Sequence, residues 1–361
     1  MKKRIIALLL SISAIFLVSC GAPQEEVVFF NWGGTIDEAV LDKFEKETNI
    51  KVTYAEFDEN EKMYTLVKSD MDLYDVIVPS EYMLEKMAAE GLVEELDHSK
   101  LPNMKYISDV FLNKEFDPGN KYSVPMYFGT LGILYNKNKV APEDLNGWNA
   151  IFNEKYKGQI WMLDSSRDTM GPGFWHLGYS SNARDPKQLK EVKELMQKQK
   201  SLVKAYVADE LISHMVNGNG AMAVTYSAKA NDAIKQNPKE LAYYLPQHSN
   251  VWMDNYAIVK NATNKENAYK LINFLCDPKN SAMSGYIQAV PIEDAKKIEP
   301  TKEASKDKVL YPPITVLTEQ ETYKDLGPFV NDFEQAWEDV KNYWWPNFVA
   351  QALRSNVWRQ K

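Results

Sequence analysis

The chain has 361 residues, a formal net charge of −8 and a hydrophobic share of 45%. This length exceeds the usual limit for one hydrophobic core, so we expect two domains. The acidic balance disfavours nucleic acid as a partner and favours cationic partners. After the N-terminus, no stretch is apolar enough to predict a membrane-spanning helix.

The N-terminus has the pattern of an export signal. Residues 2–4 are basic, and residues 5–18 form an apolar run shorter than the ~20 residues that span a bilayer. Ser19 then precedes Cys20, as a small residue precedes an export cleavage site. The stretch resembles a bacterial lipoprotein signal, which implies cleavage of residues 1–19 and acylation of Cys20, with residues 20–26 as a tether to the membrane. The alternative is an ordinary signal peptide with a chance cysteine.

Strands and helices alternate in the following part of the chain. We expect strands at residues 27–30, 50–57 and 74–79, and helices after Thr35 as N-cap, at 59–69 and at 81–91. This alternation predicts an α/β fold with a parallel, doubly wound sheet. Ligands of such sheets bind beyond the carboxyl ends of the strands, which is where Trp32 and Ser80 lie.

Two extended segments predict passages between domains. Residues 122–136 form the first passage, and residues 251–254 form the second, just before a strand at 256–259. A helix at 186–199 and a buried strand at 221–226 fall between them. We therefore expect one lobe from residues 27–133 plus 254–300, a second lobe from 134–253 plus 301–345, and an aromatic, basic tail at 346–361.

The usual enzyme and metal motifs do not occur in the sequence. It has no His-Glu-x-x-His, no Gly-x-Ser-x-Gly, no P-loop and no cysteine cluster, and its four histidines lack metal spacing. No residue pair suggests a nucleophile with its base. Cys276 ends an apolar helical pattern and is expected to be a buried structural thiol. These absences argue against an enzyme, and we expect no cofactor or metal.

Several motifs together resemble one known family, the spermidine/putrescine-binding lipoproteins of bacterial ABC transporters. The resemblance runs from about residue 27 to about residue 340. The motifs that carry it are Phe30-Asn31-Trp32, the stretches at 44–52, 74–82, 116–125 and 264–275, and Trp252-Met253-Asp254. Strand-then-Val-Pro-Ser alone is shared with other extracellular binders, whereas the set with Trp-Met-Asp is more specific.

The resemblance implies a type II periplasmic-binding-protein fold. Two α/β lobes would be joined by crossover strands and would close over a ligand in the cleft between them. A polyamine is a flexible methylene chain with charged amines, so its pocket needs apolar faces along the chain and carboxylates at the ends. Tryptophan supplies a flat wall and a cation–π attraction of ~0.5–2 kcal/mol.

Seven residues match the family's ligand positions. The resemblance implies stacking by Trp32 and Trp252, polar contacts from Ser80 and Tyr82, an amine-gripping acid at Asp254 and a second acid at Asp168, with Tyr226 replacing a stacking aromatic. Each has a structural alternative. The two tryptophans could be core residues. Asp254 could accept a hydrogen bond from the backbone at the hinge, and Asp168 could cap a helix or pair with Arg167. Ser80 could be an N-cap, and Tyr82 a rim residue without ligand contact.

The sequence departs from the family at several ligand positions. Thr35 replaces a tyrosine, Ser165 replaces an acid, Val224 replaces a tryptophan, Ala289 or Val290 replaces an aromatic, and Tyr323 or Lys324 replaces a glutamine. Asp209 or Glu210 could supply a replacement charge, although a plain loop position is the simpler interpretation. These departures leave the preference between spermidine and putrescine open.

The expected partners are a polyamine ligand, the ABC permease and ATPase, and the membrane through the lipid anchor, with the protein itself a monomer. Other hypotheses keep the fold but change the ligand to another organic cation, such as thiamine or an amino-acid-derived amine, or to ferric iron. A lipid-anchored enzyme or an adhesin is a further alternative.

Overall fold

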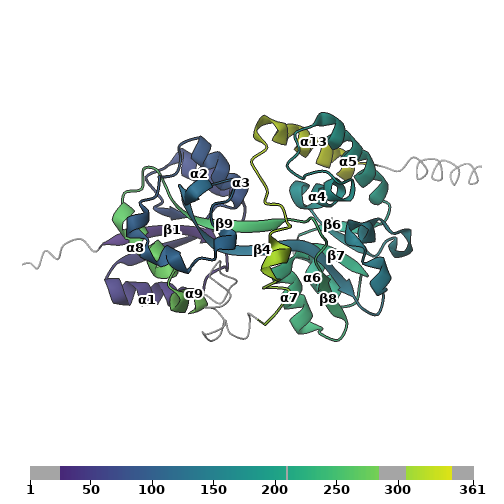
Figure 1. Ribbon diagram of the computed structural model, residues 1–361, viewed down its shortest axis with the longest axis horizontal. Coiled ribbons are helices and arrows are strands. Elements are labelled where there is room, and N and C mark those ends of the chain that lie inside the picture. The colour runs from purple at the N-terminus through teal and green to yellow at the C-terminus, as the bar shows by residue number, and fades with distance from the viewer. Residues whose placement is uncertain (1–24, 209, 284–305, 344–361) are drawn as a thin grey trace, which may run out of the picture.

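The computed structural model describes residues 25–208, 210–283 and 306–343. Side chains in this part of the chain form two separate hydrophobic cores. The first core takes residues from 27–128, 251–276 and 310–317. The second takes residues from 131–241 and 323–340. Figure 1 shows the two groups of elements on either side of two central strands, so the predicted two-lobed α/β fold is confirmed.

The first core lies around the strands β1 (Glu26–Trp32), β2 (Lys51–Phe57) and β3 (Val76–Ile77). β1 pairs in parallel with both β2 and β3, as the strand–helix alternation predicted. The neighbour of β3 on its other side is β9 (Val251–Ile258), which runs antiparallel. The sheet is therefore mixed rather than wholly parallel.

The sheet continues into the second lobe through β4 (Ser123–Asn136). β4 pairs antiparallel with β9 in its first half and with β7 (Met222–Tyr226) and β8 (Leu241–Tyr244) in its second half. β5 (Ile160–Leu163) and β6 (Val203–Val207) complete the order β2-β1-β3-β9-β4-β7-β5-β6, with β8 attached to β4. β4 and β9 thus hold both lobes on one hydrogen-bonded framework.

Helices cover the first lobe, and the first three begin close to the predicted positions. They are α1 (Glu38–Thr48), α2 (Asn60–Ser69), α3 (Glu81–Ala89), α8 (Lys265–Leu275) and α9 (Pro278–Met283). The predicted cap of the first helix was wrong, because Asp37 accepts the cap hydrogen bond from Ala39 N–H. The Thr35 hydroxyl instead donates to the carbonyl of Trp32 at 2.8 Å.

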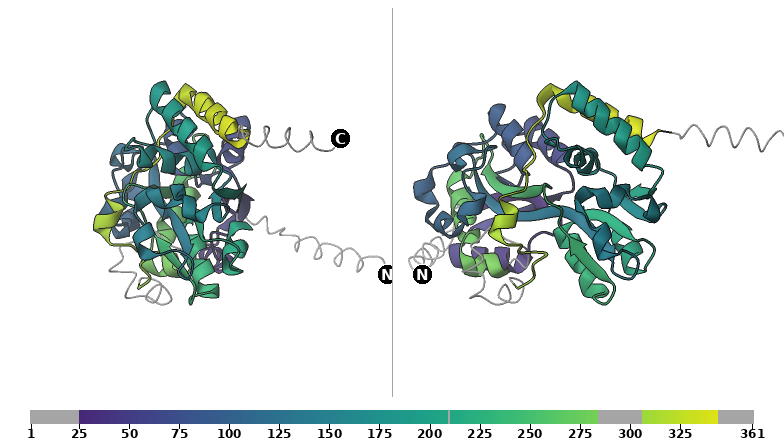
Figure 2. Two further views of the ribbon diagram at one scale, coloured as in Figure 1. Left: turned by 90° about the vertical axis from the view of Figure 1, so that its right-hand side faces the viewer. Right: turned by 45° about the vertical axis from the view of Figure 1, so that its right-hand side comes forward.

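The second lobe carries α4 (Ser166–His176), α5 (Pro186–Gln199), α6 (Glu210–Val216), α7 (Ser227–Gln236) and α13 (Val330–Lys341). α13 lies along α5, where Lys193 and Asp339 form an ion pair of 2.8 Å (Figure 2). Short helical turns fill the connections at His98–Lys100, Pro102–Tyr106, Asp109–Phe111, Pro118–Asn120, Pro142–Asp144, Gly147–Phe152, Glu154–Tyr156, Ile314–Leu317 and Gly327–Phe329.

A third passage between the lobes follows residue 317. Leu317 packs in the first core, whereas Tyr323 packs in the second. Between them, Glu321 N–H donates to the Ser249 carbonyl at 2.8 Å, and Val251 N–H donates to the Glu321 carbonyl at 2.7 Å. The sequence assigned residues 301–345 to the second lobe, whereas the packing divides the described part of this stretch between the two cores.

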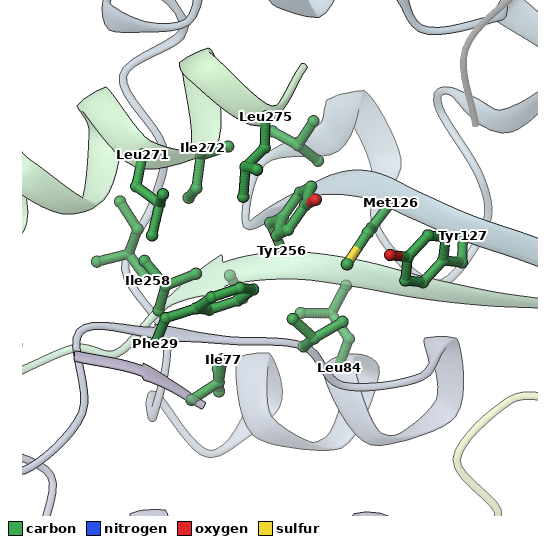
Figure 3. Packing of buried hydrophobic residues seen from close by; sticks show 14 of the residues in the cluster. Phe29, Ile77, Leu84, Met126, Tyr127, Tyr256, Ile258, Leu271, Ile272 and Leu275 are labelled. Atoms are coloured by element: carbon green, nitrogen blue, oxygen red, sulfur yellow. The ribbon is translucent and has the colours of Figure 1, made fainter. Parts of the chain in front are cut away.

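The first core is closed by side chains from strands and helices that are far apart in the sequence. Figure 3 shows the strands that carry Phe29, Ile77 and Ile258 between two helices, with Leu271 of α8 on one side and Leu84 of α3 on the other. Cys276 follows α8, and burial raises the pKa of its thiol to about 12. The thiol is therefore buried and protonated, as the sequence predicted.

Within residues 25–208, 210–283 and 306–343, no helix combines the length and apolarity needed to cross a bilayer. Several predictions concern residues outside the described part of the chain. These are the signal with Cys20, the residues Asp209, Ala289 and Val290, and the tail at 346–361.

Candidate ligand-binding site

The first half of the candidate site forms where β9 meets the start of α3. Ser80 and Asp254 are bridged as isolated antiparallel β partners, and the Ser80 hydroxyl donates to Asp254 Oδ1 at 2.7 Å. Ser80 occupies the N-cap position of α3, but its side chain makes no capping bond. Its hydroxyl oxygen accepts from the Asn60 amide instead. Asp254 is only 8% exposed.

Burial controls the charge of Asp254. Loss of water raises the pKa of its carboxyl to about 7, while the Ser80 hydrogen bond opposes the rise by favouring the charged form. The carboxyl therefore titrates close to neutral pH. A positive group placed beside it would stabilise the carboxylate and lower this pKa.

Asn60, the first residue of α2, organises the polar residues next to Asp254. Its amide donates to the Ser80 hydroxyl and to the Tyr82 hydroxyl, both at 3.1 Å. The Tyr82 hydroxyl in turn donates to Glu61 at 3.1 Å. Tyr82 packs against both cores, so it lies between the lobes. The sequence analysis missed Asn60, and a single asparagine at a helix start carries no signal that distinguishes it from a cap.

The second half of the candidate site centres on Asp168, in the first turn of α4. Asp168 Oδ2 accepts from the Tyr226 hydroxyl at 2.6 Å and the Ser165 hydroxyl at 2.7 Å. Its Oδ1 accepts from the Tyr323 hydroxyl at 3.2 Å. Burial raises the pKa of both phenols well above the usual value, so both stay protonated and donate.

The neighbours of Asp168 have separate roles. Ser165 is the N-cap of α4 and accepts from the Asp168 N–H at 3.4 Å. Arg167 donates to Asn182 Oδ1 at 2.9 Å and to the Lys324 carbonyl at 3.1 Å, and its guanidinium lies over the Tyr323 ring at 4.3 Å.

Trp252 connects the two halves of the site. It lies on β9 directly before Met253 and Asp254, and its ring meets the Tyr226 ring edge-on, with centroids 6.2 Å apart. Its indole covers Gly129 of β4, where an added Cβ would lie 2.3 Å from Trp252 Cζ2. Gly129 was also missed, although a glycine within a strand pattern is the usual signal of close approach.

Trp32 lies at the end of β1, and its ring packs on Phe57 with centroids 4.6 Å apart. It is connected to the other residues through Thr35, whose carbonyl accepts a hydrogen bond from Tyr127, the register partner of Asp254. Within the described part of the chain, no hydrogen bond or ring contact joins the Trp32 side chain directly to the other six candidates.

The substituted family positions have different surroundings. Val224 is fully buried in the second core, and Tyr226, two residues further on, contacts both Asp168 and Trp252. Lys324 forms an ion pair with Glu115, and Glu210 is exposed at the start of α6. Among the residues that the structure describes, no cluster of three His, Cys, Asp or Glu side chains could hold a metal ion.

The chain matches known proteins over most of its length. The model of the family "Bacterial extracellular solute-binding protein" matches residues 39–310. The spermidine/putrescine-binding periplasmic protein of Salmonella typhimurium is 32% identical over 322 residues, which cover 88% of this chain and 92% of that protein. The putrescine-binding periplasmic protein SpuD of Pseudomonas aeruginosa is 32% identical over 335 residues, covering 87% and 91%.

Solved structures agree with these relatives. The spermidine/putrescine ABC transporter substrate-binding protein PotD of Streptococcus pneumoniae superposes with a TM-score of 0.79 at 37% identity, covering 88% of this chain and 99% of that one. A putative spermidine/putrescine ABC transporter protein from Listeria monocytogenes gives a TM-score of 0.78 at 38% identity, covering 89% and 100%. The chain therefore belongs to the bacterial extracellular solute-binding proteins, in the family that includes the spermidine/putrescine-binding proteins.

Proposed function

We propose that this protein captures a polyamine, putrescine or spermidine, and delivers it to the permease of an ABC importer. The observation that carries the proposal is a pair of buried carboxyls, one from each lobe. Asp254 is 8% exposed and Asp168 is 7% exposed, and the Trp252–Tyr226 ring contact lies between their segments. Two acids separated by aromatic side chains suit a guest with two amines and an apolar chain.

The acids differ in their free capacity for an amine. A carboxylate offers about four acceptor positions. Asp168 already accepts from Tyr226, Ser165 and Tyr323, whereas the Asp254 side chain accepts from Ser80. Asp254 thus keeps more acceptor positions for an ammonium group. We therefore assign the main amine contact to Asp254 and an orienting contact for the second amine to Asp168.

The aromatic side chains supply the remaining recognition. Trp252 is half-buried beside Asp254, so its indole face would cover the methylenes next to the bound amine. An ammonium over an indole gains ~0.5–2 kcal/mol, more as the site loses water. We assign Trp32, Ser80 and Tyr82 to the same pocket because β1, α3 and β9 bring them to one edge of the sheet.

The proposal is tested by isothermal titration calorimetry of the folded protein without its signal segment. Putrescine and spermidine are titrated separately, with thiamine and a ferric salt as alternative ligands. We expect binding of at least one polyamine and weaker binding of the alternatives. Absence of heat with both polyamines, or tighter binding of thiamine or iron, contradicts the proposal.

The remaining assignments concern the protein in the cell. We propose that it acts without catalysis as a monomer, outside the cytoplasm, and that acylated Cys20 anchors it to the membrane. Replacement of Cys20 by Ala is expected to move the protein from the membrane fraction to the soluble fraction. Unchanged membrane retention of the variant contradicts the anchor. We also propose that the two lobes move about the three passages as the ligand binds.

A further inference from the structure

A third acid is buried next to the site and belongs to none of the ligand positions. Glu81 is the first residue of α3, directly after Ser80, and is 1% exposed. Its Oε2 accepts from the Met253 N–H at 2.9 Å, and its Oε1 accepts from the Tyr323 N–H at 3.2 Å. At the protein surface, such hydrogen bonds would add little to stability because water competes for both groups. In the buried position of Glu81, each bond holds a backbone segment in place.

Both amides belong to segments that carry site residues. Met253 lies between Trp252 and Asp254 on β9. Tyr323 lies on the third passage, and its own hydroxyl donates to Asp168 in the second lobe. One carboxyl from the first lobe therefore holds the backbone beside Asp254 and the backbone that orients Asp168.

We infer that Glu81 is a positioning residue that fixes the spacing between the two amine-binding acids. The inference deepens the proposed function and rests on it for the identity of the ligand. We assign Glu81 no contact with the guest, because it is 1% exposed and both of its oxygens accept from backbone donors. It acts through Met253 on Asp254 and through Tyr323 on Asp168.

The same helix provides a matched control. Glu85 lies one turn further along α3 and accepts from the Asp325 N–H at 2.7 Å. Like Glu81, it ties α3 to the third passage. No hydrogen bond joins Asp325 to Asp168 in the described structure, so Glu85 holds the passage without orienting an acid of the site.

The test compares E81Q with E85Q. A glutamine at position 81 retains the size of the side chain, but its carbonyl oxygen can accept only one of the two N–H groups, and its NH2 faces the other. We expect E81Q to weaken polyamine binding by about 10- to 100-fold, the range found for residues that orient the ligands of metal sites. We expect E85Q to change the dissociation constant by less than about 3-fold, because Glu85 holds no backbone segment that carries or orients one of the two acids. Equal effects of the two variants, or wild-type affinity of E81Q, overturn the inference.

Two further measurements separate positioning from general destabilisation. In the ligand-free protein, hydrogen exchange at the Met253 and Tyr323 amides is expected to be faster in E81Q and unchanged in E85Q. This readout does not depend on the ligand, so it still tests Glu81 if the wild-type protein binds no polyamine. Unchanged exchange at both amides contradicts the inference.

Y323F tests the relay to Asp168 and remains informative if E81Q does not fold. It keeps the backbone bond to Glu81 and removes the hydroxyl that orients Asp168. Y323F is expected to weaken binding. The double variant with E81Q is expected to lose less binding free energy than the sum of the two single losses, because both residues act on the same acid. Wild-type affinity of Y323F contradicts the relay.

Discussion

Polyamine affinity is expected to depend on pH because Asp254 must be charged to attract an ammonium group. Burial raises the pKa of the Asp254 carboxyl to about 7 in the ligand-free protein. Aliphatic amines titrate near ~10, so the ligand keeps its charge between pH 5 and 8. Within this range Asp254 titrates together with the neighbouring Glu81, whose pKa burial raises to about 8. Glu81 is assigned no contact with the ligand, so the charge that meets the ammonium group is that of Asp254.

The size of the effect follows from the fraction of protein with an ionised Asp254. With a pKa of about 7, this fraction is about 10% at pH 6 and about 1% at pH 5. The apparent dissociation constant rises in inverse proportion to the competent fraction. We expect binding to be about 10-fold weaker at pH 6, and about 100-fold weaker at pH 5, than above the pKa.

Calorimetry with putrescine in buffers from pH 5 to pH 8.5 measures this profile. D254N is the reference, and we expect it to lose about 2–5 kcal/mol of binding free energy at pH 8 and most of its pH dependence. S80A removes the hydrogen bond that favours the charged form, so its midpoint is expected at higher pH than that of the wild type. An affinity that is flat between pH 5 and pH 8 in the wild-type protein refutes the reasoning.

The Asp254 carboxyl also makes the free energy of unfolding depend on pH. Stability falls as pH rises, whereas polyamine affinity increases. The folded-state pKa of Asp254 lies above its usual value of 3.8, so the folded protein binds more protons than the unfolded chain between about pH 4 and pH 7. Ligand-free stability is therefore expected to fall as pH rises through this window, by about 4 kcal/mol from this group alone. Thermal unfolding of D254N is expected to lose this part of the pH dependence.

Two further predictions concern packing. G129A places a Cβ 2.3 Å from the Trp252 indole, so we expect it to displace the ring. Polyamine binding is expected to weaken by about 10-fold or more, and the tryptophan fluorescence to shift. Wild-type affinity and emission would contradict the contact. The buried Cys276 thiol is expected to react with a thiol reagent only after unfolding, so rapid labelling of the native protein would show that it is accessible.

The sequence indicated where the candidate residues that follow strands would lie, and it missed the residues whose contacts depend on distant partners. Trp32 and Ser80 could be placed at strand ends because the strand–helix alternation defines that edge of the sheet. The antiparallel β9 between β3 and β4 was not predicted, because a buried apolar run contains no information about strand direction.

The roles of Asn60, Glu81 and Tyr323 could not be inferred locally. Each acts through a partner more than 19 positions away in the sequence, such as Glu81 with Met253 at a separation of 172. A glutamate that begins a helix looks like an ordinary favourable charge at the helix N-terminus. Only the packing of α3 against β9 and the third passage turns it into a buried bridge.

The central claim is that the two acids receive the two ends of one guest, and a comparison of putrescine with 1-butylamine tests it most directly. Calorimetry on the wild-type protein and on D168N gives the ratio of the two affinities in each. We predict that putrescine binds the wild type at least about 10-fold more tightly than butylamine, since it gains a second charge-assisted contact, and that D168N removes most of this advantage. An unchanged ratio in D168N, or equal affinity of the wild type for both amines, would contradict the account.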